Sequence, residues 1–330
     1  MNLTDQFLRK INYLRVSVTD RCDLRCVYCM KEKMQFLPRK DISTLEEIER
    51  LCDNFIELGI EKIRLTGGEP LVRNNIIKLI ERLNYKKDNT NLKEITLTTN
   101  GSLLKKYAKQ LKLNGINRIN VSLDTINSDK YKKITRFGNI EKVFDGINES
   151  LDADIKIKIN TVVIKDFNEN EIENLINWTN NKKIDLTFIE VMPMEETDIS
   201  REYQFTSLTE IYDRLDKKYK FIKNDQNTGG PARYFTSNLI STKIGFISPL
   251  TNNFCATCNR VRISSTGKLF MCLGQNDYVD FREIMRKDYS DNYIKEKIRF
   301  ALNIKPKKHD FMNGTKINKY IKRHMNVTGG

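Results

Sequence analysis

The chain has 330 residues, of which 30% are charged and 39% hydrophobic, and its formal net charge is +14. This length suffices for a large core without disulfide bonds, and the periodic spread of hydrophobic residues argues against disorder. No apolar run is long enough to span a membrane and the N-terminus does not resemble a signal peptide, so we expect a cytoplasmic protein with no membrane partner. The positive charge alone does not distinguish nucleic acid from a small anionic substrate.

Strand and helix patterns alternate from residue 13 to residue 219. Segments rich in Ile, Val, Leu and Thr predict strands at 13–18, 62–66, 94–98, 118–122, 155–163 and 185–190. Helical spacing of apolar residues follows at 44–58, 74–84, 103–114, 140–151, 170–181 and 207–219. Six strand–helix units in series, without a Rossmann glycine fingerprint after the first strand, favour an α/β fold with an incomplete (β/α)6 TIM-like barrel.

The pattern changes near residue 222. A glycine-rich loop is followed by a segment, 234–247, that predicts short antiparallel strands. We therefore expect two domains, residues 1–221 and a smaller domain at residues 222–330. From Lys305 onward the composition alone is that of a flexible basic tail.

Six of the seven cysteines fall into two groups of three, and Cys52 lies on the apolar stripe of a predicted helix, as a core residue would. The first group is Cys22, Cys26 and Cys29. The second group is Cys255, Cys258 and Cys272. Three thiolates can hold a four-iron, four-sulfur cluster with one iron left open, so each group predicts such a cluster.

Zinc is the alternative for both cysteine groups. The first spacing could belong to a zinc site or be coincidental, and the second group could form a zinc knuckle completed by a carboxylate. The two histidines, His309 and His324, are far from both groups in the sequence. A closed structural zinc site needs four ligands, which argues against this interpretation.

The first group, with Tyr28 before its last cysteine, resembles the defining motif of the radical S-adenosylmethionine (SAM) superfamily. The second group, the segment at 259–262 and the terminal Gly329 and Gly330 make nearly the whole chain resemble the GTP 3′,8-cyclase family of molybdenum-cofactor biosynthesis. This resemblance implies an incomplete six-unit barrel closed by a smaller C-terminal domain that carries the second cluster. The implied cofactors are two [4Fe–4S] clusters and SAM.

The resemblance also implies an activity. SAM binds the open iron of the first cluster, and one electron from an external donor releases a 5′-deoxyadenosyl radical that removes the 3′ hydrogen of GTP. Attack of the sugar on guanine C8 gives (8S)-3′,8-cyclo-7,8-dihydroguanosine 5′-triphosphate, which a cyclic pyranopterin monophosphate synthase consumes downstream. No side chain is expected to act as an acid or base. No nucleic-acid partner is implied, and a homodimer is left open.

Loops at the carboxyl ends of the strands carry most residues that the resemblance assigns to the site. The SAM contacts are Tyr28, Gly68, Ser122 and Met192. The GTP contacts are Arg15, Lys62, Arg64, Thr98, Lys158, Arg260 and Arg262. Guanidinium groups suit phosphate oxygens because they bind them in bidentate geometry. Turnover is expected to depend on Arg260 and Arg262 and on Gly329 and Gly330, whose backbone would thread to the barrel mouth beside these arginines.

Thr187 departs from the family pattern, since an arginine is usual at this place, and the presumed pocket has one charge fewer.

Two other interpretations of the protein's function stay open. A peptide-modifying radical SAM enzyme with an auxiliary cluster would need neither Arg260 and Arg262 nor the Gly-Gly tail. A basic zinc protein that binds nucleic acid fits the charge, but its ligand count and its dispersed lysines argue against it.

Overall fold

A sheet of twelve strands organises the structure, a computed structural model that describes residues 3–195, 197–198, 200–225, 229–313, 316–317 and 321–329. Its six central strands are neighbours in chain order and run parallel. They are β1 (Tyr13–Ser17), β2 (Lys62–Thr66), β3 (Glu94–Thr99), β4 (Arg118–Ser122), β5 (Lys156–Val163) and β6 (Asp185–Glu190). Each predicted strand is present, and its ends agree with the prediction within one residue, so the α/β fold with a parallel sheet is confirmed.

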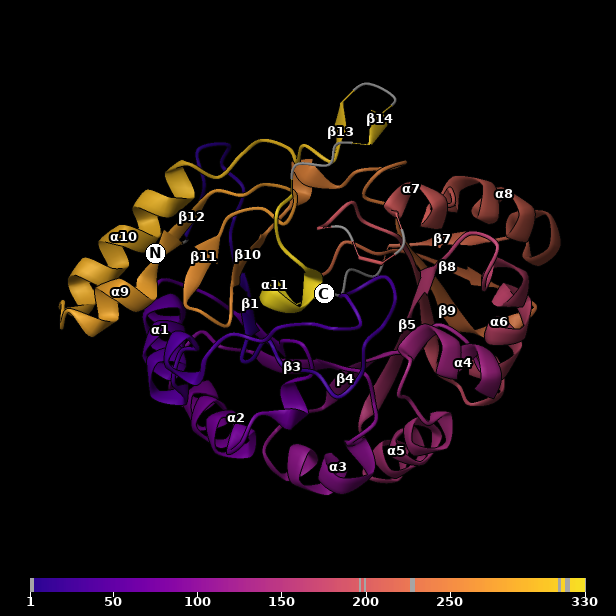
Figure 1. Ribbon diagram of the computed structural model, residues 1–330, viewed down its shortest axis with the longest axis horizontal. Helices are drawn as coiled ribbons and strands as arrows, with labels where there is room; N and C mark the ends of the chain where they lie inside the picture. Colours follow the sequence, from indigo (N-terminus) through magenta and orange to yellow (C-terminus); the bar gives the residue numbers. More distant parts are fainter. Residues whose placement is uncertain are drawn as a thin grey trace.

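Six helices follow these strands and cover the outer side of the arched sheet in Figure 1. They are α1 (Leu45–Glu57), α2 (Ile76–Tyr85), α3 (Leu104–Leu113), α5 (Ile140–Asp152), α6 (Ile172–Asn181) and α8 (Leu208–Tyr219). Helix α1 begins at a capping box, in which the Thr44 side chain accepts from the Glu47 amide and the Glu47 carboxylate accepts from the Thr44 amide. Its buried stripe includes Phe55 and Cys52, which is a core residue as predicted.

The chain after residue 222 extends one edge of the parallel sheet beyond β6. Strand β9 (Ile240–Ile247) pairs parallel with β6 and antiparallel with β8 (Arg233–Ser237), which pairs with β7 (Ile222–Asn224). The antiparallel strands predicted within 234–247 are therefore present, but their addition to β6 was not predicted.

The same part of the chain also extends the opposite edge. Strand β10 (Arg260–Ile263) pairs parallel with β1 and antiparallel with β11 (Lys268–Phe270), which pairs with β12 (Tyr278–Asp280). The sheet order thus runs from β12 at one end to β7 at the other. Both outermost strands have three residues.

Five further helices and two short strands complete the α-helices and strands of the described residues. They are α4 (Ser128–Thr135), α7 (Arg201–Gln204), α9 (Phe281–Arg286), α10 (Asp291–Asn303), β13 (Met312–Asn313), β14 (Lys316–Ile317) and α11 (Met325–Thr328). Helix α10 packs against α1. Among the helices of the described residues, none combines the length and the apolarity that a bilayer crossing requires.

The expectation of a flexible tail from Lys305 onward is wrong for the described residues. Lys305, Phe311, Ile321 and Asn326 are all buried. Phe311 and Ile321 pack with Met194 in a small hydrophobic cluster, which composition alone did not reveal because these apolar residues are widely spaced among lysines and asparagines. Figure 1 shows α11 inside the arch of the sheet, so the end of the chain returns to the middle of the molecule.

Candidate active site

A first cavity is lined by all three cysteines of the first group and by residues at the carboxyl ends of β2, β4 and β6. The predicted SAM contacts also line it: Tyr28, Gly68, Ser122 and Met192. The structure therefore brings these seven residues together, as expected of strand-end loops in a parallel sheet. Met325 and Asn326 of α11 form part of the same lining.

Helix α4, which the sequence interpretation missed, holds the cysteine loop. The amides of Arg25 and Val27 donate to the carbonyls of Thr135 and Ile134, at 3.0 Å and 2.9 Å. Directly after the helix, Arg136 donates to the Arg25 carbonyl at 2.9 Å. The loop that carries Cys26 and Cys29 is thus fixed by backbone hydrogen bonds rather than by a disulfide.

Tyr28 is oriented by Asp124 at the end of β4. The Tyr28 hydroxyl donates to Asp124 Oδ2 at 2.8 Å, and the Val162 amide donates to Asp124 Oδ1 at 2.8 Å. Burial raises the pKa of Asp124 to about 6 even though both hydrogen bonds lower it. Burial and the neighbouring carboxylate raise the pKa of Tyr28, so the phenol keeps its proton and donates.

The TGGEP loop at 66–70 packs on the backbone of the cysteine loop. A Cβ at Gly67 would lie 2.7 Å from the Thr19 carbonyl oxygen, and one at Gly68 would lie 2.3 Å from the Arg21 carbonyl oxygen. Both glycines are therefore required by close backbone contact, whatever their role toward a cofactor. The next residue, Glu69, accepts from the Asn100 amide at 2.7 Å and so joins the loops after β2 and β3.

Two thiols of the first group, Cys22 and Cys26, are held in an environment that disfavours a free thiolate. Burial raises the pKa of Cys22 and of Cys26; the Glu69 carboxylate raises that of Cys22 further, and the neighbouring thiols that of Cys26. Deprotonation is therefore expected to accompany metal binding, which supplies the compensating positive charge. Across the part of the chain that the structure describes, no three His, Cys, Asp or Glu side chains are placed to hold a single metal ion.

A second cavity adjoins the first, because Thr98, Asn160, Ile189 and Met192 line both. The second cysteine group lines it together with six of the seven predicted GTP contacts, namely Arg15, Arg64, Thr98, Lys158, Arg260 and Arg262. Among the described residues, no aspartate or glutamate lines this cavity. It therefore presents five basic side chains to a ligand, and no carboxylate of the described lining neutralises them.

Strand register explains why the cations converge. Arg262 of β10, Arg15 of β1 and Arg64 of β2 are paired across three adjacent parallel strands, so they occupy one row of the sheet. A second row joins Asn120 of β4 to Lys158 of β5. Side chains of one row point to the same face of a sheet, which places these groups above the same cavity.

Burial and neighbouring positive charges lower the pKa of two basic side chains in this cavity, Arg15 and Lys158. Burial lowers the pKa of Arg15, and Arg262 lowers it further. Burial and then Arg64 lower the pKa of Lys158 to about 7. Burial alone would raise the pKa of the Tyr13 phenol, but Arg64 and Arg15 outweigh it and lower the value to about 8. An anionic ligand would relieve this concentration of positive charge.

Several buried polar atoms that line the second cavity have no hydrogen-bond partner among the described residues. They are Arg15 Nε, Arg64 Nε, Arg262 Nη1, Asn120 Oδ1 and Asn160 Oδ1. Buried polar groups are normally hydrogen-bonded, so this set of donors and acceptors fits a polar ligand with both kinds of group. The sequence interpretation missed Asn120 and Asn160, although both lie in or at the end of predicted strands, on the same rows as predicted contacts.

Lys62 is the one predicted GTP contact that does not line the second cavity. It lies at the start of β2, and its Nζ is 2.8 Å from Glu94 Oε2 in an ion pair. Lys158, by contrast, lines the cavity and donates to the Tyr234 hydroxyl at 3.0 Å. Lys62 and Arg64 are two residues apart and share one face of β2, but Arg64 lies closer to the carboxyl end of the strand.

Lys305 is a component of the second cysteine site that the sequence interpretation missed. Its side chain is buried, with Nζ 3.7 Å from Cys258 Sγ, 3.0 Å from the Arg260 carbonyl oxygen and 2.5 Å from that of Met271. Burial would raise the pKa of Cys258, but the charges of Arg260 and Lys305 lower it to about 6. The composition of the segment suggested solvent-exposed lysines, and no local pattern marks Lys305 as different.

His309 is close to the second cysteine group in space, although it is far from that group in the sequence. The fold returns residues after α10 to the cavity that Cys255, Cys258 and Cys272 line. Both ring nitrogens are engaged, because Nε2 lies 2.9 Å from the Pro249 carbonyl oxygen and Nδ1 accepts from the Phe311 amide at 3.4 Å. The ring is therefore held by backbone groups.

The C-terminal segment reaches the carboxyl end of β2. The atoms nearest to a Cβ added at Gly329 are those of Thr66, at 1.7 Å and 2.6 Å, and the Gly67 amide nitrogen at 3.2 Å. Asn326 donates to the Asp20 carbonyl at 2.8 Å. Gly329 thus lies at Thr66, beside the first cavity, while Gly330 lies outside the described residues.

Thr187, the departure from the family pattern, is fully buried in β6. It is paired with Gly245 of β9, where an added Cβ would lie 2.8 Å from Thr187 Oγ1. Thr187 lines neither cavity. Its hydroxyl therefore fills space next to a glycine rather than contributing to the described lining.

The fold and the first cavity define a radical SAM protein, a class whose members use a [4Fe–4S] cluster and SAM. The chain matches the model of the Radical SAM superfamily over residues 16–179 and that of Molybdenum Cofactor Synthesis C over residues 184–311. The solved structure of Streptococcus suis SuiB bound to S-adenosylmethionine shares the fold, with a TM-score of 0.61 and 17% identity. That match covers 88% of this chain and 68% of SuiB.

The chain belongs to the GTP 3′,8-cyclase family. It is 49% identical over 329 residues to the GTP 3′,8-cyclase of Brucella ovis, covering 99% of this chain and 96% of that protein. It is 50% identical over 330 residues to the GTP 3′,8-cyclase of Sinorhizobium medicae, covering 100% and 95%. The family recognised from the cysteine spacing and the C-terminal motifs is thus confirmed over the whole chain.

Proposed function

We propose that this enzyme cyclises GTP to (8S)-3′,8-cyclo-7,8-dihydroguanosine 5′-triphosphate in molybdenum-cofactor biosynthesis. The observation that carries the proposal is the pair of adjoining cavities, one lined by the first cysteine group and the other by the second cysteine group and five cations. A nucleoside triphosphate matches the second cavity because it brings negative charge to a lining without carboxylates.

The first cavity would hold a [4Fe–4S] cluster on its three cysteines, with SAM bound at the open iron. When bound, this pair supplies a 5′-deoxyadenosyl radical after one-electron reduction by an external donor. The donor set fits, since three thiols on one loop leave one iron free. Tyr28, Gly68, Ser122 and Met192 would contact SAM, and Asp124 orients Tyr28 for that role.

The second cavity would hold another [4Fe–4S] cluster on Cys255, Cys258 and Cys272, with GTP beside it. Lys305 supports this fit because it places a fixed positive charge at the sulfur of Cys258. The row of Arg262, Arg15 and Arg64 would bind the triphosphate, with Arg260, Lys158 and Thr98 around it. Lys62 would act indirectly, through its ion pair with Glu94.

Asn120 and Asn160 extend the assigned set of substrate contacts. Each has a buried side-chain oxygen that finds no hydrogen-bond partner in the part of the chain that the structure describes, and each lines the second cavity. These oxygens would accept hydrogen bonds from ribose hydroxyls or guanine N–H groups, which are the donors that GTP offers. Asn160 also lines the first cavity, so it lies where the sugar has to meet the radical source.

The domain organisation that suits this function is an incomplete (β/α)6 barrel at residues 1–221, closed by residues 222–330. The addition of β9 to β6 and of β10 to β1 supports it, because the C-terminal part meets the barrel at both of its edges. The product would pass to a cyclic pyranopterin monophosphate synthase.

Cysteine variants test the proposal by separating its two halves. Cys26→Ala is expected to abolish formation of 5′-deoxyadenosine, whereas Cys272→Ala should retain slow SAM cleavage and lose cyclised GTP. Cys52→Ala is the matched control, since this cysteine is buried in the helical layer outside both groups. A Cys272→Ala enzyme with full cyclisation would contradict the second-cluster assignment.

A further inference from the structure

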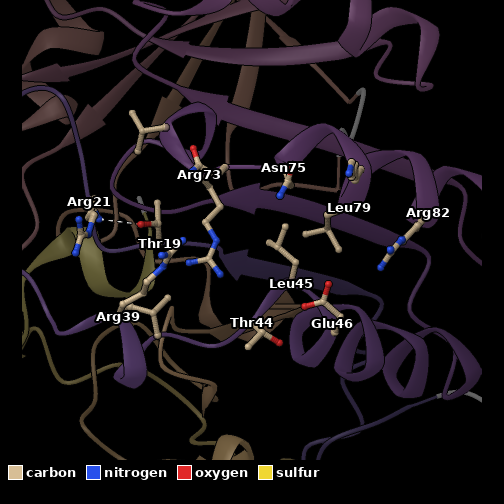
Figure 2. A pocket seen from close by; sticks show the side chains of 14 residues that line it. Thr19, Arg21, Arg39, Thr44, Leu45, Glu46, Arg73, Asn75, Leu79 and Arg82 are labelled. Carbon is tan, nitrogen blue, oxygen red and sulfur yellow. Dashed lines mark hydrogen bonds between the residues drawn. The ribbon is translucent and has the colours of Figure 1, made fainter.

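A basic pocket lies outside both cavities, between the cysteine loop and the beginnings of α1 and α2 (Figure 2). Its volume is about 660 Å³. Among its lining residues five are basic, Arg21, Arg39, Arg73, Lys78 and Arg82, and one, Glu46, is acidic. We refer to it as the basic pocket.

The cations of the basic pocket are poorly neutralised by the protein. In the described structure, no carboxylate lies within ion-pair distance of Arg21, Arg39 or Lys78, whereas Arg82 pairs with Glu49 at 2.9 Å. Figure 2 shows Arg21, Arg39 and Arg73 on one flank of the pocket. Burial lowers the pKa of Arg73, and Arg39 lowers it further. Arg21 also lowers it, whereas Glu46 and Asp20 raise it, so the positive charge around Arg73 is only partly neutralised and an anionic surface would complement it.

The basic pocket shares a wall with the first cavity. Thr19 and Arg21 line the pocket, and Arg21 directly precedes Cys22, which lines the cavity. On the cavity side, Gly67 and Gly68 touch the backbone of the same two residues. One layer of backbone at residues 19–22 therefore has cations on one side and the cluster-binding cysteine on the other.

We propose that the basic pocket docks an acidic one-electron carrier protein that reduces this enzyme. The inference rests on the proposed function, because it requires a cluster at Cys22, Cys26 and Cys29. At the interface one electron passes from the carrier to that cluster. The carrier is oxidised by one electron, the enzyme is reduced by one, and no bond forms or breaks. The electron is consumed when SAM is cleaved.

The exposure of the cations favours a protein surface over a small anion. Arg21, Arg39, Lys78 and Arg82 are exposed, on long side chains around the rim. Sites for small anions hold their ligand with buried, convergent donors, as the second cavity does. Exposed charges around a hollow instead speed the encounter with a complementary surface and depend on ionic strength.

The test compares two ways of reducing the reconstituted full-length enzyme. The double charge reversal Arg39→Glu/Lys78→Glu is assayed for 5′-deoxyadenosine formation with an acidic flavodoxin or ferredoxin as reductant, and separately with dithionite. Lys142→Glu/Lys217→Glu is the matched control, since it makes the same change in net charge at exposed positions on α5 and α8. Iron content and the initial GTP cyclisation rate with dithionite are measured for all forms.

We expect the pocket variant to lose about tenfold or more in rate with the protein carrier, and to match wild type with dithionite. The control should match wild type with both. Salt should slow only the carrier-driven reaction of wild type. Equal rates of the pocket variant and the wild type with the protein carrier would overturn the proposal. So would an equal loss of the carrier-driven rate in the control variant. A wild-type enzyme that neither flavodoxin nor ferredoxin reduces would also overturn it.

A small-anion pocket would give a different result. Inorganic phosphate or pyrophosphate would then bind wild type but not the pocket variant, and the carrier-driven rates of the two proteins would agree, which contradicts carrier docking. Failure of the proposed function is visible independently, because dithionite-reduced wild type would then form no cyclised GTP whatever the state of the pocket.

Discussion

Individual cysteines of the second group differ in their surroundings although they line one cavity. Burial raises the pKa of Cys255 and of Cys272, while Arg260 and Lys305 bring the pKa of Cys258 down to about 6. A depressed thiol pKa means that the thiolate predominates once the pH exceeds that value, and the thiolate is the reactive form. Cluster-free protein should therefore have one distinctive thiol in this group.

Alkylation of cluster-free protein with iodoacetamide tests this difference. Cys258 is expected to react with an inflection near pH 6, and Cys255 and Cys272 only at higher pH. Lys305→Met removes the charge next to Cys258 Sγ, so its inflection should move upward, toward the value of about 8.5 of an ordinary cysteine. Peptide mapping by mass spectrometry gives the rate at each site. The same inflection for all three cysteines would contradict the electrostatic effect assigned to Arg260 and Lys305. Circular dichroism checks that the Lys305→Met variant is folded.

Residues were predictable where a motif or a strand end marked them. The cysteines and Gly68 belong to loops with recognisable spacing, and Arg15 and Arg262 lie on strands next to those loops. Lys305 was not predictable, since its burial depends on how the chain returns after α10. The ion pair of Lys62 involves Glu94 on the neighbouring strand, and register is not visible in a single strand.

Helices and strands were predicted correctly where the periodic pattern of apolar residues extended over enough residues. The six parallel strands alternate with helices of ten or more residues, whose buried stripes are clear in the sequence. Helix α4 was missed because it has eight residues and few apolar positions, notably Tyr131 and Ile134. Helix α10 carried a usable signal, with Ile294, Ile298 and Leu302 buried along one stripe, and was still not identified. Pairing of β10 with β1 joins segments far apart in the chain, which periodicity cannot reveal.

The element whose role is easiest to disturb is α11. Gly329 has a φ of +72°, and a Cβ there would lie 1.7 Å from Thr66 Oγ1. Gly329→Ala should therefore displace the end of the chain from the first cavity and lower GTP turnover by about tenfold or more, a loss of about 1.4 kcal/mol in transition-state stabilisation. Iron content and SAM binding should stay at wild-type levels.

The control for this prediction is Lys322→Ala, an exposed residue in the same segment. Its turnover should equal that of wild type, measured as cyclised GTP at matched iron content. Wild-type turnover in Gly329→Ala would show that the end of the chain has no part in the reaction. Deletion of Gly329 and Gly330 is expected to act in the same direction.

The whole molecule depends on one continuous sheet. Strands from the C-terminal part cover both edges of the six parallel strands, and the outermost strands, β7 and β12, have only three residues each. Short outer strands limit edge-to-edge association between molecules. Without residues after 221, β1 and β6 would both be exposed as longer edges, of five and six residues.

A fragment of residues 1–221 is therefore expected to aggregate, although it contains all six strand–helix units. Size-exclusion chromatography with light scattering, with the full chain under the same conditions as reference, measures this directly. A monomeric fragment that unfolds cooperatively would contradict the expectation and would indicate that the first domain folds without the second.

The central claim is that SAM cleavage in one cavity acts on GTP held in the adjoining one. The most direct measurement is anaerobic incubation of the reconstituted wild-type enzyme with SAM, GTP and dithionite, using GTP deuterated at C3′. The account predicts cyclised GTP together with 5′-deoxyadenosine that carries deuterium. Deuterium-free 5′-deoxyadenosine without cyclised GTP would contradict it, because the radical would then have formed without reaching the nucleotide.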